Sequence, residues 1–152
     1  MIMYDANNIA DYVLVYGDKH NYFLSNLKLQ KLLYMIQAYF LIVKDKPCFF
    51  NPIEAWDFGS VVPEVYSCYK FFGSTTIPAP KYKNFDITKK DKKLINEVVD
   101  EFKEYTSVDL MKLIHNQTPY QEAFKNKTVI SIDSLRRFFC DEEGVEDDER
   151  AN

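Results

Sequence analysis

The chain carries the stretch NLKLQKLLYMIQAYFLIV at residues 26–43. Its apolar residues recur at the three- and four-residue spacing of a helix, and Ser25 or Asn26 is placed to cap its start. Pro47 closes it. No other segment has so wide an apolar face, and we expect the part of this face from Leu29 to Phe40 to be buried. It consists of Leu29, Leu32, Leu33, Ile36, Phe40 and Val43.

The flanking sequence predicts further helices, most of them with a recognisable start. Gly17 and Gly73 are placed to end the first and the third helix. The residues expected at the starts of these helices, as caps or first-turn residues, are Asp5, Pro63, Thr88, Ser107, Thr118 with Pro119, and Asp133.

Two regions between these helices favour β-structure. Residues 48–58 predict two short strands around the turn Asn51–Pro52, and residues 128–132 predict another short strand. Residues 74–87 contain two prolines and form the one long loop, a kind of segment that is often functional. The expected fold class is therefore mostly α, an α+β chain with a minor β-ribbon in a compact bundle of about six or seven helices.

Charge divides the chain into one domain, residues 1–140, and an acidic tail, residues 141–152. The net charge is −4, but residues 141–150 alone hold seven acids and one base. A run of like charges repels itself, so we expect this tail to be solvated and disordered.

Composition excludes several classes of protein. No segment approaches the roughly 18 apolar residues of a membrane-spanning helix, and the first residues lack the pattern of a secretory signal. The three cysteines, Cys48, Cys68 and Cys140, are odd in number and widely spaced, which indicates buried thiols in a reducing compartment. The two histidines, His20 and His115, offer no metal-ligand spacing. We expect a cytoplasmic protein with no membrane contact, no metal and no cofactor.

Catalysis and nucleic-acid binding have little support. His115 is the one sensible general base, but no nucleophile motif accompanies it, and the four glycines are too far apart for a phosphate-binding loop. Residues 81–93 interleave lysines with Tyr82 and Phe85, as a single-strand binder would, yet acids dilute this stretch and the pI is near 5.2. We expect no enzyme and no catalytic residues; a hydrolase centred on His115 stays open as an alternative.

Two longer motifs carry a resemblance to a known family. NLKLQKLLY at residues 26–34 and EAWDFGSVVPEVY at residues 54–66, followed by His115, Pro119, Tyr120 and Ala123 at similar spacing, resemble the Panacea domain family, also called SocA-like antitoxins or phage-associated GepA-like proteins. The resemblance covers about residues 4–140. Ser60 stands where the family usually has proline, and Tyr120 where it has tryptophan. The motif positions are Asn26, Lys28, Gln30, Lys31, Tyr34, Glu54, Trp56, Gly59, Pro63, Glu64, Tyr66, His115 and Pro119.

This resemblance implies an antitoxin that neutralises a protein toxin by direct contact, and it implies a cellular protease as a further partner. The alternative is a regulatory protein of a phage or mobile element, with the same fold, that binds a host protein. Our candidate partner-binding residues are Trp56, Tyr82, Phe85 and His115, with the loop 74–87 as part of the face. For the polar motif residues, a buried network and a binding site are both open.

The acidic tail should be dispensable for folding. Because it has almost no apolar side chains to bury, it cannot offset the entropy of ordering. We expect a chain that ends at Cys140 to melt close to the temperature of the full chain in a thermal scan. A melting temperature many degrees lower would show that the tail is structural.

Overall fold

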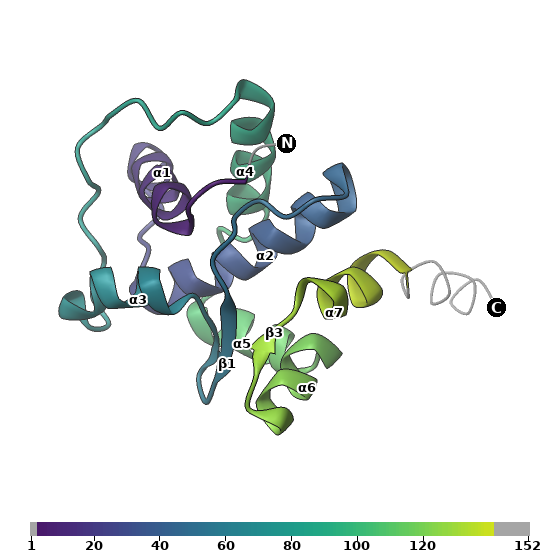
Figure 1. The fold of residues 1–152 in the computed structure, drawn as a ribbon. Helices are drawn as coiled ribbons and strands as arrows, with labels where there is room; N and C mark the ends of the chain where they lie inside the picture. Colours follow the sequence, from purple (N-terminus) through teal and green to yellow (C-terminus); the bar gives the residue numbers. More distant parts are fainter. Residues whose placement is uncertain (1–2, 142–152) are drawn as a thin grey trace.

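The helix α2 (Asn26–Lys44) crosses the middle of the computed structural model, which describes residues 3–141 (Figure 1). Of the expected acidic tail, all but Asp141 lies outside the described residues. The Ser25 side chain accepts a hydrogen bond from the Lys28 backbone N–H and caps the helix, and Asp45 ends it in the left-handed conformation. Most α2 residues are buried, polar ones included. A helix buried on nearly all sides forms the centre of a domain.

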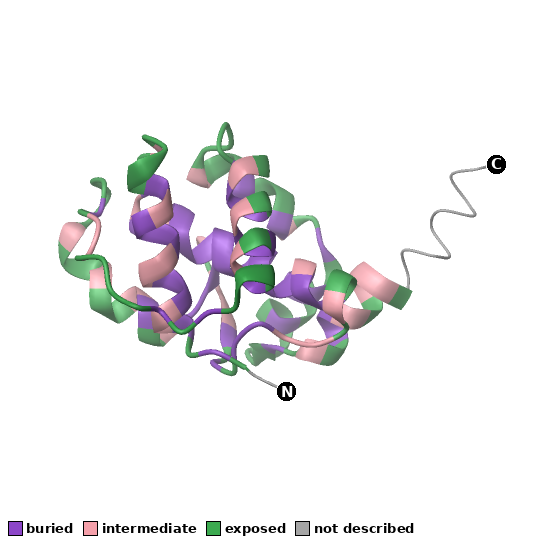
Figure 2. Ribbon diagram, turned by 90° about the horizontal axis from the view of Figure 1, so that it is seen from above, coloured by how far each residue is buried: buried purple, intermediate pink, exposed green. Residues whose placement is uncertain are grey.

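Within residues 3–141, six further α-helices pack around α2 and the small sheet, and their outer faces are exposed while their inner faces are buried (Figure 2). With a small sheet, they confirm the mostly α fold class. The helices are α1 (Ala6–Lys19), α3 (Pro63–Tyr69), α4 (Lys89–Glu101), α5 (Ser107–His115), α6 (Thr118–Asn126) and α7 (Ile132–Arg136), with a 3₁₀ turn η1 (Lys70–Phe72) after α3 and a π-helical turn η2 (Arg137–Asp141) after α7.

Local caps decide where most helices begin. Asp5 and Thr88 cap α1 and α4 through their side chains, as the sequence predicted. For α5 the cap is Thr106, which forms a capping box with Asp109, so the prediction of Ser107 was wrong by one residue. Gly17 does not end α1, which continues to Lys19; it lies instead at a close contact, where a Cβ would be 3.0 Å from the Leu24 Cδ1.

The sheet has three short strands in the order β2-β1-β3, all antiparallel. β1 (Ile53–Trp56) and β2 (Gly59–Val61) form a hairpin, and β3 (Val129–Ile130) pairs with the other edge of β1. The two residues between β1 and β2 make the turn, and Gly59 follows at a φ of 115° that favours glycine.

The chain bends at Asn51, but the predicted pair of strands around Asn51–Pro52 does not form, because β1 pairs with β2 and β3. Asn51 instead uses its side chain to join distant segments: its Oδ1 accepts a hydrogen bond from the Ala6 N–H at 2.7 Å, and its Nδ2 donates to Glu64 at 2.9 Å. The preceding chain forms a bridge between Phe49 and Tyr4, so it does not pair with β1.

The loop 74–87 has no regular structure, as expected, but it is fastened along its length. The Ile77 N–H donates to the Leu24 carbonyl at 2.9 Å, and Ile77, Phe85 and Ile87 are buried. It runs from α3 past α1 to α4 (Figure 1). It is therefore a strap across the helices, anchored by three buried side chains, while most of its other residues are exposed.

Residues 3–141 were compared with the expectations for membrane-spanning helices, metal sites and cysteines. In this range no helix has the length and apolarity to cross a membrane, and no group of three His, Cys, Asp or Glu side chains is arranged to hold a metal ion. The prediction that all three cysteines are buried is wrong: Cys48 is buried, Cys140 is half-buried and Cys68 is exposed.

Truncating a side chain of the central stripe should cost much of the stability. Leu33 is fully buried, so Leu33→Ala removes apolar contacts and leaves a cavity in the core. We expect the free energy of unfolding, measured by urea denaturation, to fall by about 2–5 kcal/mol. Val43→Ala in the same helix is the control, because Val43 is 61% exposed. Equal effects of the two substitutions would contradict the central place of α2.

Candidate functional site

Two polar motif residues, Asn26 and Gln30, join α2 to the start of α3. The Gln30 Oε1 accepts a hydrogen bond from the Val62 N–H at 2.9 Å, and its Nε2 donates to the Asn26 Oδ1 at 2.9 Å. Asn26 in turn donates to the Tyr66 carbonyl at 3.1 Å. Gln30 and Asn26 are buried, so these bonds replace water that the groups cannot reach. The network fixes the chain between β2 and α3 on α2.

Tyr34 and Glu64 have comparable structural roles. The Tyr34 hydroxyl donates to the Gln117 Oε1 at 2.6 Å, which ties α2 to the joint between α5 and α6. Burial raises the pKa of the Tyr34 phenol far above its usual range, so the hydroxyl stays protonated as a donor. Glu64 accepts a hydrogen bond from Asn51, which joins α3 to the chain before β1.

Lys28 and the two motif prolines also serve the fold. The Lys28 ammonium donates to the Lys103 carbonyl at 3.1 Å, and burial lowers the pKa of Lys28. Pro63 and Pro119 lie in the first turns of α3 and α6, where a missing N–H costs no hydrogen bond.

Lys31 and His115 differ from these residues, because each has a buried nitrogen with no hydrogen-bond partner. Burial lowers the pKa of Lys31 to about 8, and burial together with the Lys31 charge lowers the pKa of His115. The Lys31 Nζ lies 5.5 Å from the centre of the Phe58 ring, a cation–π contact. A Cβ on Gly59 would lie 2.7 Å from the Lys31 Cε, so only glycine fits above this lysine.

Stacked rings connect His115 to the surface of α6. The His115 ring stacks on Tyr120 at 4.4 Å, and Tyr120 stacks on Phe124 at 5.6 Å. The Tyr120 hydroxyl donates to the Trp56 carbonyl and so holds α6 against β1.

Trp56 is a half-buried member of an aromatic cluster on the hairpin. Its Nε1 donates to the Glu54 Oε1 at 2.9 Å. Its ring packs edge-on against Phe58 at 5.6 Å and Tyr66 at 5.2 Å. The ring is held by neighbours of its own hairpin and of α3, and its remaining surface faces solvent.

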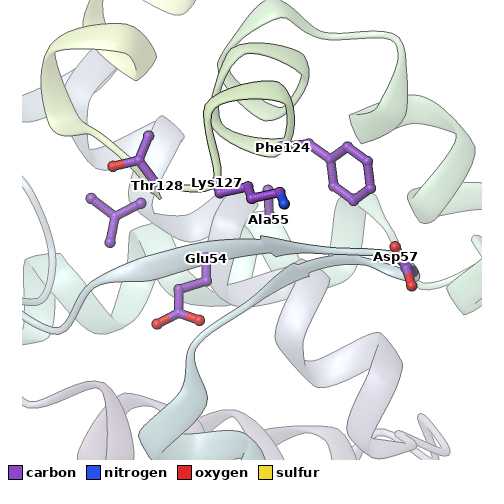
Figure 3. Close-up of a pocket in the computed structure, with 7 residues that line it drawn as sticks. Glu54, Ala55, Asp57, Phe124, Lys127 and Thr128 are labelled. Carbon is purple, nitrogen blue, oxygen red and sulfur yellow. The ribbon is translucent and has the colours of Figure 1, made fainter.

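A hollow of about 650 Å³ lies between the hairpin, α6 and β3 (Figure 3). In Figure 3, Phe124 and Lys127 stand on one side of β1 and Asp57 lies at the end of the strand. Phe124 is 45% and Val129 is 43% exposed, so the hollow offers apolar contact area beside charges of both signs. Its walls are Glu54, Ala55, Asp57, Phe124, Lys127, Thr128 and Val129.

The comparison with known families decides the relationship. The family described as "Antitoxin SocA-like, Panacea domain" matches residues 29–121, more than half of the chain. The chain belongs to this family. The predicted resemblance is thereby confirmed, and the match includes the hairpin, Lys31 and His115.

A curated relative has the same family name. "Antitoxin SocA" of Caulobacter vibrioides (strain NA1000 / CB15N) is 40% identical over 78 residues, which cover 51% of this chain and 38% of that protein. The match thus spans well under half of the relative's length. No solved structure matches this member of the family.

The candidate residues chosen from the sequence lie in two separate places. Trp56 and His115 meet through Tyr120 beside the hairpin. Tyr82 lies in the strap 74–87, where it is 72% exposed and has the Lys19 ammonium 5.6 Å from its ring centre. Phe85 is only 2% exposed and packs in the core, so our expectation that it could contact a partner is wrong.

Sequence reasoning missed Phe124 and Val129. A signal for Phe124 exists, because residues four apart share a helix face and Tyr120 was already in the motif. Val129 carries no such signal, since its exposure depends on how β3 pairs with β1.

Removing the Gln30 amide should destabilise this Panacea domain. Gln30→Met keeps the length of the side chain but leaves the Val62 N–H and the Asn26 side chain without their partner. We expect a loss of roughly 1–3 kcal/mol in the free energy of unfolding, measured by urea denaturation. Gln121→Met is the matched control, because Gln121 is exposed and makes one bond, to the His115 carbonyl. If both variants unfold alike, the network does not fix the fold.

Proposed function

We propose that this chain is an antitoxin that neutralises a protein toxin by direct binding, without catalysing a reaction. The observation that carries the proposal is membership of the SocA-like antitoxin family across residues 29–121. The name of the Caulobacter relative supports it. As the resemblance implies, the proposal extends to delivery of the bound toxin to a cellular protease.

The face that we assign to the toxin is the hairpin face, defined as the hairpin β1–β2 with α6 and β3. Apolar side chains and a hollow support this choice: Phe124 and Val129 are about half exposed on the walls of the hollow, and the half-buried Trp56 belongs to the same hairpin. Aromatic anchors beside a hollow are the usual centre of a protein interface. Asp57 and Lys127 on its walls provide polar contacts of both signs.

The surroundings of His115 support a role without catalysis. A histidine base needs a nucleophile within hydrogen-bond reach, and the buried Nε2 of His115 has no hydrogen-bond partner among residues 3–141. Stacking on Tyr120 instead gives the ring a clear part in holding α5, α6 and the hairpin together.

Rescue of growth tests the proposal. The toxin is first identified by pull-down from the native host and by a gene that lies beside the gene of this chain. It is then co-expressed with variants of this chain, all present at the same protein level. We expect Phe124→Ala with Val129→Ala to abolish rescue, because loss of two anchors should cost on the order of 2–4 kcal/mol of binding. Melting temperatures should stay close to that of the wild type, because both side chains are partly exposed.

Tyr82→Ala is the matched control in the same assay. It removes an exposed ring from the strap 74–87, away from the hairpin face, and rescue should persist. Loss of rescue by Tyr82→Ala alone would move the site to the strap. Capture of a host protein with no toxic partner and no rescue would favour the host-factor alternative instead.

A further inference from the structure

Lys31 is a buried positive charge without a counter-charge in contact. Its exposed fraction is 1%, and its ammonium has no hydrogen-bond partner among the described residues. The contact with the Phe58 ring compensates only part of the hydration that the ammonium loses on burial. An unpaired buried charge destabilises a fold, so a charge of this kind points to a ligand.

The cover over this ammonium is thin. Phe58, whose ring lies over it, is half-buried, and so is His115, which contributes the second unpartnered nitrogen. Gly59 completes the cover with backbone alone. A small movement of the Phe58 ring would therefore open a path from solvent to the ammonium.

Ser60 also has a buried, unpartnered hydroxyl, but it does not belong to this group. Successive side chains of a strand point to opposite faces, and the Gly59 position faces Lys31. The group therefore consists of Lys31, which lies against Gly59 of the hairpin, and His115, which is close enough for the Lys31 charge to lower its pKa.

We propose that Lys31 and His115 form a binding site for a single carboxylate of a partner protein, which enters beneath Phe58. The Lys31 ammonium would donate to one carboxylate oxygen and the His115 Nε2–H to the other, so that both orphaned groups gain a partner. This site depends on the proposed function in one respect only: the carboxylate is assumed to belong to a protein that binds this chain.

Neighbouring charges favour a single carboxylate over a polyanion. Glu54 and the exposed Asp57 lie on the same hairpin and would repel the successive phosphates of a nucleic acid. A single acidic side chain with apolar neighbours has one negative charge, so it can avoid Glu54 and Asp57 where a row of phosphates cannot. It would bring its one charge to Lys31 and its apolar neighbours to the Trp56 cluster.

Stability gives the first test. Lys31→Met keeps an unbranched chain of similar length and removes the charge. We expect the melting temperature of the free variant to equal or exceed that of the wild type, because a lone buried charge has been removed. A clearly lower melting temperature would mean that Lys31 is a structural residue and would overturn the proposal.

Direct binding gives the second test, with acetate as the probe. In NMR spectra of the free protein with ¹³C-labelled lysine and histidine, acetate should cause a saturable shift of the Lys31 Cε and His115 ring signals. Sodium chloride at equal ionic strength should not. The His115 shift should vanish in Lys31→Met and persist in Lys112→Met, which removes an exposed lysine of α5.

Three results would overturn the site: no saturable shift, the same His115 shift in Lys31→Met, or a shift with inorganic phosphate but none with acetate. Because the free protein is used, failure here leaves the antitoxin proposal standing. Failure of growth rescue, in turn, leaves the acetate result standing.

Discussion

A helix enclosed by its neighbours has to satisfy every polar group that it carries, and α2 is such a helix. Gln30 binds the start of α3, Tyr34 binds the joint before α6, and Gln37 accepts the N–H groups of Cys48 and Phe49. Each partner belongs to a different segment, so the polar groups of one helix set the positions of the segments around it. Lys31 is the exception: its ammonium has no hydrogen-bond partner among the described residues, and it lies against Gly59 at the start of β2.

The parts of the fold that depend on neighbouring residues were predictable. Asp5, Ser25 and Thr88 cap helices within three residues of themselves, so composition and spacing revealed them. The turn of the hairpin was not predictable in this way. Asn51 looked like a turn residue beside Pro52, but its partners are far along the chain, at Ala6 and in α3, and only the folded chain brings them to it.

The candidate site was predictable to a smaller extent. The motifs contained Trp56 and His115, and their resemblance to a family gave the relationship that the comparisons confirm. Exposure was harder to infer: Tyr82 and Phe85 lie three residues apart with similar surroundings in sequence, yet one is exposed and the other is in the core. That difference arises from packing of the strap against α1, which no local pattern records.

The most direct test of the central claim, that a toxin binds the hairpin face, is amide hydrogen exchange of the chain alone and in complex with its toxin. We predict slower exchange in β1, β2 and α6 on binding, with the strap 74–87 unchanged. The strap is fastened to α1 and to Leu24 without a partner, so binding elsewhere should leave its exchange as it is. Slower exchange confined to residues 74–87, or no change in the hairpin, would contradict the account.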